Sequence, residues 1–409
     1  MSKPRALIIG GSVGGLLACA LFRQRGWDAT IFERARGDLS GRGAGLGISG
    51  DLVDIMLGVG ARFDASTGSA HASYDWMRRD GTIAFTDARP TVGSTWPRIY
   101  RPLRDVVPES AYRQDMSLVR VEQDDAGVAA VFADGTRETG DLLIAADGVY
   151  STTRRQFLPE VGPVYANYVA WRGIVEESEV SEAALRAIEH KLVYCFPEGE
   201  MLLAMTVPGA GEDTRFGHRR VYFIWYRPAG PEALADLCTD AVGKNHGASI
   251  PPPLIRRAFI DELKSAARET MPACVAEIVE RAQRPLLQAV SDLRTTKMVF
   301  GRVALMGDAA FIARPHTAAG VSKAALDAKA LIDELSATPR DMAGALARYE
   351  AARMDFGRKL CDHSRWLGAF LEAGGDAVRD PREIIRQYGA QTLLRPVDVE
   401  ALQAPAEAR

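Results

Sequence analysis

ALIIGGSVGG, residues 6–15, joins a short, continuously apolar run to a turn that is rich in glycine. Apolar residues then recur at helical spacing as far as Gly26, which stands where a glycine commonly ends a helix. Residues 29–32 predict a second strand that ends at Glu33. A strand, a helix and a strand in this order indicate a parallel sheet of the α/β class.

The glycine-rich turn has the residue types that a phosphate-binding loop needs. A helix N-terminus presents unpaired N–H groups and a partial positive charge, so a pyrophosphate binds there when no side chain blocks its approach. Gly10 permits the tight turn and Gly15 lets the helix pack close to the strand, whereas Ser12 replaces the middle glycine of the G-x-G-x-x-G pattern. A tight strand–helix turn with no ligand is the structural alternative.

Glu33 lies at the spacing where an acid accepts hydrogen bonds from the ribose hydroxyls of a dinucleotide. The alternative is a solvated carboxylate at the end of a strand. With the glycines in front of it, Glu33 favours adenosine binding, but these residues do not decide between NAD and FAD.

The composition is that of a soluble globular enzyme. The 409 residues allow two or three domains or one intertwined unit, with 47% hydrophobic and 25% charged residues. The formal net charge is −3 and no long run of one charge occurs, so we expect neither nucleic acid nor a membrane surface as a partner.

The five cysteines are far apart, odd in number and contain no CxxC pair. This pattern predicts free thiols in a reducing compartment, with no disulfide framework and no metal site. Met1 to Arg5 lead directly into the first apolar run without a signal peptide, and no apolar run approaches the roughly 20 residues of a membrane span. A cytoplasmic location is therefore expected.

Later segments supply the other predicted elements. Strands are expected at 117–122, 128–132, 141–146 and 303–306, an antiparallel sheet over 165–230, and a buried helix over 321–335. Asp134-Gly135, after the strand at 128–132, is a hairpin turn signal.

Two further motifs carry a family resemblance. Residues 146–154, ADGVYSTTR, and Gly307-Asp308 with Pro315 and Gly320 downstream stand in the order of the A-D-G-x-x-S-x-x-R and second FAD fingerprints of flavoprotein aromatic hydroxylases. The chain therefore resembles the single-component (class A) FAD-dependent aromatic hydroxylases over almost its whole length. Within them, residues 314–320 are most similar to bacterial hydroxylases of hydroxylated pyridines, of the 2,6-dihydroxypyridine 3-hydroxylase kind.

The resemblance implies a set of FAD contacts. Glu33 and Arg34 would lie at the adenosine end, Asp308 beside the ribityl chain and Pro315 beside the flavin ring. The expected contacts are Gly10, Ser12, Val13, Gly14, Gly15, Glu33, Arg34, Arg42, Gly45, Leu103, Val119, Asp147, Gly148, Asp308, Pro315, Ala318, Ala319, Gly320 and Val321. Many relatives carry Arg-x-x-Leu on the helix that covers the FAD, and here Tyr100-Arg101-Pro102-Leu103 stands in that place, so the role of Arg101 stays open.

The implied fold is α/β, a doubly wound, Rossmann-like FAD-binding fold of the para-hydroxybenzoate hydroxylase type. A mixed or antiparallel substrate sheet and C-terminal helices would complete it. We expect a discontinuous FAD-binding domain (1–72, 97–164 and 286–338), a substrate domain (73–96 and 165–285) and a C-terminal helical segment (339–409). The sequence leaves the oligomeric state open, and a homodimer is compatible with it.

The resemblance also implies a reaction. Bound FAD would be reduced by NADH or NADPH, and O2 would form a flavin C4a-hydroperoxide that hydroxylates a small aromatic substrate. No second glycine-rich strand–helix–strand unit appears, so the nicotinamide donor would bind only transiently. Another FAD-dependent oxidoreductase, such as an oxidase or a double-bond reductase, is the alternative function, and a non-catalytic nucleotide-binding module is a third.

The substrate pocket would lie between the flavin and the antiparallel sheet. Its candidate polar groups, and candidate catalytic residues, are His316, Tyr194 and Tyr222. For the two tyrosines the alternative is packing within strands, where aromatic residues are common. His218 is more easily explained as a solvated loop residue, and Trp171 and Trp225 as core.

Overall fold

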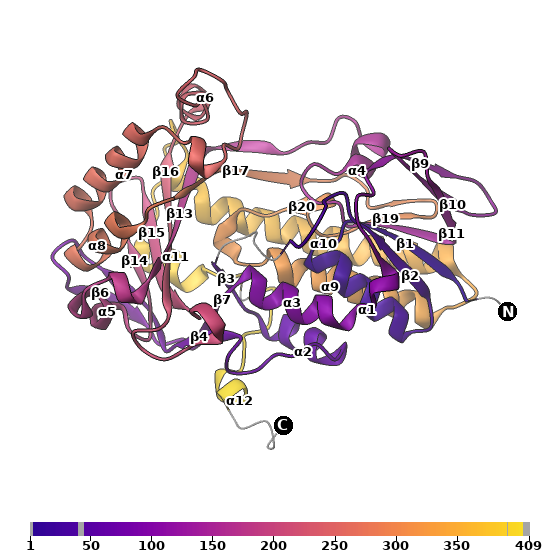
Figure 1. Cartoon of the computed structure of the whole chain (residues 1–409), viewed down its shortest axis with the longest axis horizontal. Coiled ribbons are helices and arrows are strands. Elements are labelled where there is room, and N and C mark those ends of the chain that lie inside the picture. Colours follow the sequence, from indigo (N-terminus) through magenta and orange to yellow (C-terminus); the bar gives the residue numbers. More distant parts are fainter. Residues whose placement is uncertain (1–2, 40–44, 391, 404–409) are drawn as a thin grey trace.

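Two large β-sheets organise the chain, and the computed structural model describes them within residues 3–39, 45–390 and 392–403 (Figure 1). One sheet is mainly parallel and lies towards the N-terminus, at the right of the view. The other is mainly antiparallel and lies at the left, and the long C-terminal helices run between the two parts.

The mainly parallel sheet has six strands. Its order is β18 (Val299–Phe300), β19 (Val303–Leu305), β12 (Leu142–Ala145), β1 (Arg5–Ile9), β2 (Asp28–Phe32) and β8 (Tyr112–Arg113), and only β18 is antiparallel to its neighbour. Ala6 pairs with Leu142 on one side and with Ala29 on the other. β12 and β19 are completely buried and β1 is buried from Ala6 to Ile9, which explains their continuously apolar sequences.

Different layers cover the two faces of this sheet. Helices α1 (Val13–Gln24) and α9 (Gly320–Ala337) pack on one face, and α10 (Met342–Gly368) packs on α9. The other face is covered by a three-stranded antiparallel sheet, β9 (Leu118–Gln123), β10 (Val128–Phe132) and β11 (Arg137–Gly140). Phe132 of that sheet packs against Phe32, with 4.9 Å between the ring centroids.

The second large sheet has eight strands and is mixed. Its order is β20 (Phe311–Ile312), β17 (Leu286–Arg294), β13 (Val164–Glu176), β16 (Arg220–Pro228), β15 (Met201–Val207), β14 (Lys191–Cys195), β5 (Ser73–Met77) and β6 (Ile83–Asp87). Neighbours are antiparallel except β14 and β5. The smaller sheet β3 (Gly45–Gly47), β7 (Thr91–Thr95) and β4 (Gly68–His71) lies beside it.

Alternation along the strands gives the eight-stranded sheet two apolar faces. Trp171 and Trp225 point outward into a core shared with α5 (Glu182–Ile188), α7 (Arg257–Thr270) and α8 (Ala273–Arg281). Tyr168 and Tyr226 point inward, where Leu367 of α10 joins them. The end of α10, η7 (Ala369–Leu371) and α11 (Pro381–Gln387) cover this inner face, so the C-terminal segment faces the tyrosine-rich side of the sheet.

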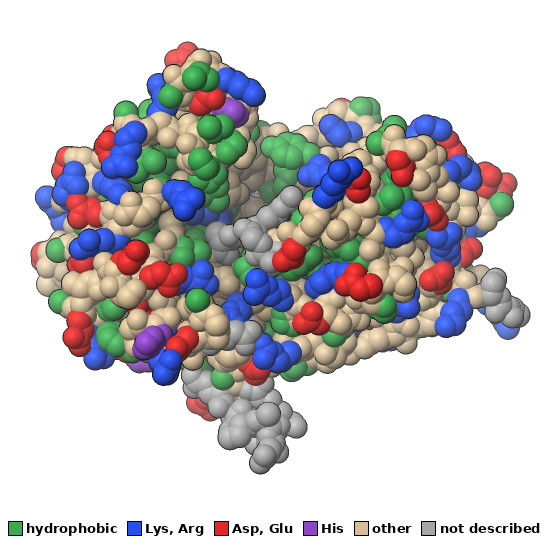
Figure 2. All heavy atoms as spheres, viewed as in Figure 1, with side chains coloured by type: hydrophobic (Ala, Val, Ile, Leu, Met, Phe, Trp, Pro, Cys, Tyr) green, Lys and Arg blue, Asp and Glu red, His purple; other side chains and the backbone are tan. Residues whose placement is uncertain are grey.

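The strand–helix–strand opening, the hairpin at Asp134-Gly135, the antiparallel sheet and the buried helix after Gly320 are confirmed. Coverage of one face of the parallel sheet by strands β9 to β11 was not predicted. Figure 2 shows basic and acidic side chains interspersed over the face in view. No helix in the described part of the chain is long and apolar enough to cross a membrane.

A buried carboxylate holds α9 to its neighbours. Asp327 accepts a hydrogen bond from the backbone N–H of Gly307 (2.9 Å) and another from Nε of Arg353 on α10 (2.6 Å). We expect Asp327→Ala to lower the free energy of unfolding by about 3–5 kcal/mol, because it leaves the Arg353 charge buried without its partner. Urea unfolding of the purified protein measures this change.

Asp333→Ala is the matched control on the same helix. Its carboxylate pairs with Lys329 and Arg25 at the surface, so the loss should be below about 1 kcal/mol. Equal losses in the two variants would contradict the role given to Asp327.

Candidate active site

A first cavity, of about 420 Å³, opens at the glycine-rich turn; we call it the glycine-loop cavity. It lies at the carboxyl ends of β1, β2 and β12, where parallel sheets commonly bind ligands. Its lining includes Gly10, Ser12, Glu33, Arg34, Leu39, Trp96, Met116, Asp147 and Gly148.

Close packing excludes side chains from the turn itself. Gly10 has φ = 105°, and a Cβ there would lie 2.4 Å from the carbonyl oxygen of Ala146. A Cβ at Gly15 would lie 1.9 Å from the carbonyl oxygen of Gly10. Ser12 begins α1 without a side-chain cap, so the N–H groups of the first turn remain available to an anion in the cavity.

Glu33 is 6% exposed and braces this turn. One carboxylate oxygen accepts the N–H of Gly11 (2.7 Å) and the other accepts the N–H of Ala35 (2.8 Å). A carboxylate has about four acceptor positions, so Glu33 keeps capacity for ribose hydroxyls.

The motif of residues 146–154 ties the two predicted fingerprints together. The buried Arg154 donates to the carbonyl oxygens of Ala309 (2.9 Å) and Val149 (2.7 Å), which links the turn after β12 to the turn after β19. Burial raises the pKa of Asp147, although hydrogen bonds from Ser151 and Thr153 oppose this. Oδ1 of Asp147 has no hydrogen-bond partner among the described residues and lies at the glycine-loop cavity.

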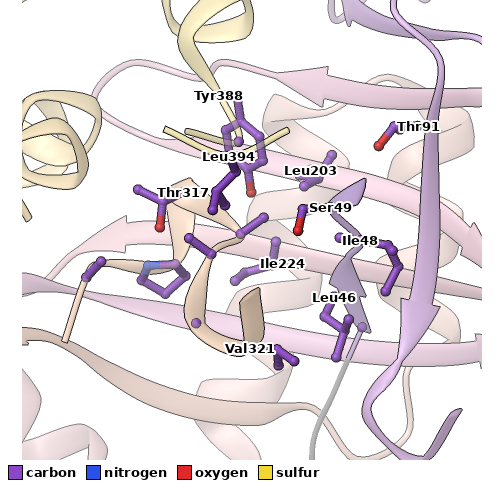
Figure 3. Close-up of a pocket in the computed structure, with 18 of the residues that line it drawn as sticks. Leu46, Ile48, Ser49, Thr91, Leu203, Ile224, Thr317, Val321, Tyr388 and Leu394 are labelled. Atoms are coloured by element: carbon purple, nitrogen blue, oxygen red, sulfur yellow. The ribbon is translucent and has the colours of Figure 1, made fainter. Parts of the chain in front are cut away.

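A second cavity, of about 340 Å³, lies against the inner face of the eight-stranded sheet; we call it the sheet cavity. Figure 3 shows side chains from four separate parts of the chain converging on it. They are Leu46 and Ile48 from β3 and the residues after it, Leu203 and Ile224 from the sheet, Thr317 and Val321 from the turn before α9 and the start of α9, and Tyr388 and Leu394 from the C-terminal segment. The lining is mainly apolar with a few polar groups, as in most small-molecule sites.

The predicted FAD contacts divide between the two cavities. Gly10, Ser12, Glu33, Arg34, Asp147 and Gly148 line the glycine-loop cavity, whereas Gly45, Asp308, Pro315, Ala318, Ala319, Gly320 and Val321 line the sheet cavity. Val13, Gly14 and Gly15 form the first turn of α1. Leu103 is fully buried in α3 (Trp96–Val106), Val119 is 52% exposed on β9, and Arg42 lies outside the described residues.

Of the three candidate catalytic residues, Tyr222 lines the sheet cavity. Its hydroxyl accepts a hydrogen bond from Nη1 of Arg172 (3.1 Å), and burial raises its pKa although Arg172 opposes the shift. Tyr194 and His316 are fully buried and are not among the lining residues. Burial raises the pKa of Tyr194 well above its ordinary value.

His316 is buried behind the wall of the sheet cavity. Its Nε2 pairs with the hydroxyl of Tyr168 at 2.9 Å. Burial, together with the charges of Arg314 and Arg172, lowers the pKa of His316 to about 3, so the imidazole is neutral above that pH. His218 is exposed, and Trp171 and Trp225 lie in the core on the opposite face of the sheet.

Sequence reasoning missed several lining groups. Arg172 comes from β13, Arg89 follows β6, and residues 388–389 and 394–397 come from the C-terminal segment. Period-2 alternation places Arg172 on the same face as Tyr168, which was the one signal available. Arg101 lines neither cavity but a third one, of about 810 Å³, together with Arg62, Arg98 and Arg220.

The two uncapped helix N-termini and the glycine cradle fit a dinucleotide cofactor. α1 begins at the glycine-loop cavity and α9 begins at the sheet cavity with Ala319 as an N-cap that makes no side-chain bond. Each N-terminus offers N–H donors to oxygen atoms of a ligand. The fold and these two cavities define a dinucleotide-binding protein with a mainly apolar small-molecule cavity.

Comparison with known proteins specifies the family. A family model described as "FAD binding domain-like" matches residues 165–292. The chain is 30% identical to 2,6-dihydroxypyridine 3-monooxygenase of Paenarthrobacter nicotinovorans over 91% of this chain and 92% of that protein. The solved 2,6-dihydroxypyridine-3-hydroxylase from Arthrobacter nicotinovorans matches with a TM-score of 0.85 and 28% identity over 94% of this chain and 96% of that one. Klebsiella pneumoniae HpxO complexed with FAD and uric acid matches with a TM-score of 0.70 and 25% identity, over 88% of each chain.

The chain belongs to the FAD-dependent aromatic monooxygenases of the single-component type. The predicted fold class and the enzyme class are therefore confirmed, and the alternative oxidase or reductase function is not supported. FAD is the cofactor, NAD(P)H and O2 are the co-substrates, and the bound flavin supplies the electron transfer and oxygen activation that no side chain provides.

The tight turn of α1 makes a direct test of FAD binding. We expect Gly15→Ala to weaken FAD binding by roughly tenfold or more, because the new Cβ forces α1 away from Gly10. A loss of ~1.4 kcal/mol of binding free energy already lowers the affinity by a factor of ten. Flavin absorbance per mole of purified protein measures the loss. In Gly58→Ala, at the end of α2 (Gly50–Gly58), the Cβ meets open space, and flavin content should stay at the wild-type level. Full flavin content in Gly15→Ala would contradict the cradle.

Proposed function

We propose that the enzyme inserts one atom of O2 into a small, hydroxylated N-heteroaromatic ring of the 2,6-dihydroxypyridine type. The observation that carries the proposal is the position of the sheet cavity. Residues 45–47 and 315–321 bound it on one side, and the tyrosine-rich face of the eight-stranded sheet bounds it on the other. A ring in this cavity lies between the segments expected to hold the flavin and the sheet.

The relatives support the substrate class. A 2,6-dihydroxypyridine 3-monooxygenase covers almost the whole chain, and a homologous structure contains uric acid, which is also an oxygenated N-heterocycle. The Leu, Ile, Met and Tyr side chains that line the sheet cavity suit a small aromatic ring.

The positions of the two cavities support binding of different parts of the cofactor by each cavity. Gly10, Ser12 and Glu33 would hold the pyrophosphate and ribose, and Asp308 the ribityl chain. Pro315 and the backbone of Ala318 to Val321 would lie along the flavin ring, close to the substrate. The proposed FAD-binding domain then comprises 1–72, 97–164 and 286–338, the substrate domain 73–96 and 165–285, and the helical segment 339–409.

Oxygen transfer to a ring requires that water be excluded from the reacting atoms. The position of the C-terminal segment supports such exclusion here. Residues 394–397 line the sheet cavity and are fixed to α2, because the carbonyl oxygen of Arg395 accepts the N–H of Gly50 (2.8 Å) and its own N–H donates to Asp51 (2.7 Å). This segment would close the cavity over the ring. The five free cysteines support a reducing, cytoplasmic location.

Isotope transfer tests the proposed reaction. The FAD-loaded enzyme should oxidise NADH or NADPH faster when 2,6-dihydroxypyridine is present, because the ring is the oxygen acceptor. Under heavy oxygen gas, mass spectrometry should show a product that carries one labelled oxygen atom. A reaction in water labelled with heavy oxygen, under ordinary oxygen gas, is the control and should give an unlabelled product. Stimulated oxidation without any labelled product would contradict hydroxylation of this ring.

A further inference from the structure

Four arginines line the sheet cavity, and three of them are neutralised by carboxylates. The ion pairs are Arg89–Asp87, Arg314–Asp292, Arg314–Glu372, Arg395–Asp51 and Arg395–Asp54. The fourth, Arg172, forms no ion pair with any residue in the described part of the chain. Arg172 therefore brings an uncompensated positive charge to the cavity wall.

The Arg172 guanidinium is also incompletely hydrogen-bonded. Nη1 donates to the hydroxyl of Tyr222, but Nε is buried and has no partner among the described residues. An arginine stays charged in proteins, and a buried donor without an acceptor costs free energy. Since the Tyr222 oxygen accepts from Arg172, its own hydrogen can point onward into the cavity.

The lining offers Arg172 no internal anion. Within the described lining the one carboxylate is Asp308, and it pairs with the buried Lys323 at 3.3 Å. That lining contains no histidine either. The described lining therefore contains no imidazole and no unpaired carboxylate that could act as a base and remove a proton from the ring.

The groups that face Arg172 do not change charge near neutral pH. They are Tyr222 and Tyr226 on β16, Tyr388 after α11, and His316 after β20. Burial raises the pKa of all three phenols and, with the nearby arginines, lowers the pKa of His316 to about 3. Between pH 5 and 9, any pH dependence of binding should therefore come from the ligand.

We infer that Arg172 and the Tyr222 hydroxyl form an anion subsite that selects the ring with one of its hydroxyl groups already ionised. The inference rests on the proposed function and specifies its substrate as a hydroxylated N-heteroaromatic anion. The ionised oxygen pairs with the Arg172 guanidinium at the cavity wall and accepts the Tyr222 hydrogen. An ionised oxygen also makes the ring more electron-rich, which favours attack on the activated oxygen.

Titration of the oxidised, FAD-loaded enzyme tests the subsite without turnover. The probes are 2,6-dihydroxypyridine, which ionises on its own, and benzoate, whose charge is constant from pH 6 to 9. Binding is followed by the flavin absorbance change at several pH values, in the absence of NAD(P)H and O2. For the wild type, the Kd of 2,6-dihydroxypyridine should fall as the pH rises through the pKa of the ring, while the Kd of benzoate should stay constant.

Removing the charge should abolish this selection. In Arg172→Gln both probes should bind roughly 10- to 100-fold more weakly, as expected for one lost charge-assisted contact, and the pH dependence should flatten. Arg172→Lys keeps the positive charge, so binding should weaken but the pH dependence of the Kd should remain. This variant tests the role of the charge if Arg172→Gln loses its flavin. The control is Arg227→Gln on β16, whose guanidinium pairs with Glu200 away from the cavity, and its Kd values should match the wild type.

The outcomes separate this inference from the proposed function. If Arg172→Gln binds both probes as tightly as the wild type and still gives labelled product, the function stands and the subsite is overturned. If benzoate binding depends on Arg172 but 2,6-dihydroxypyridine gives no labelled product, the anion subsite stands and the proposed ring is wrong.

Discussion

The buried ion-pair cluster around Arg314 fixes the eight-stranded sheet to the C-terminal helices. Arg314 donates to Asp292 of β17 (2.9 Å) and to Glu372 of the C-terminal segment (2.7 Å), and Arg365 of α10 also reaches Asp292 (2.5 Å). Burial opposes ionisation of Asp292, but hydrogen bonds from Arg365 and Arg314 hold its pKa below the ordinary value. The cluster sets the turn at Pro315–Thr317 and thereby the wall shared by the sheet cavity and the start of α9.

The sheet cavity combines apolar packing with a few fixed polar groups. Residues 394–397 line it and are anchored to α2, while Arg154 joins the turns after β12 and β19. These links hold together parts of the chain that are far apart in the sequence. His316 is a neutral structural residue behind the wall of this cavity and Arg172 brings the unpaired charge to the wall, so the cavity is built to hold a ring anion.

Local patterns were sufficient for the elements and for the motifs that line the two cavities. The apolar run before Gly10, the hairpin at Asp134-Gly135 and the motifs at 146–154 and 307–320 each depend on nearby residues alone, and all lie where the sequence placed them. Long-range packing was not predictable in the same way. Arg172 becomes part of the site only because β13, β16 and the C-terminal segment pack together, and Tyr194 and His316 lie behind the wall because neighbouring side chains cover them.

A crystal structure of the FAD-loaded enzyme with 2,6-dihydroxypyridine tests the account most directly. We predict the flavin ring along Pro315 to Val321 and the substrate ring in the sheet cavity, with one ring oxygen within hydrogen-bond distance of both the Arg172 guanidinium and the Tyr222 hydroxyl. A substrate ring bound outside the sheet cavity, or bound inside it with no contact to Arg172, would contradict the account.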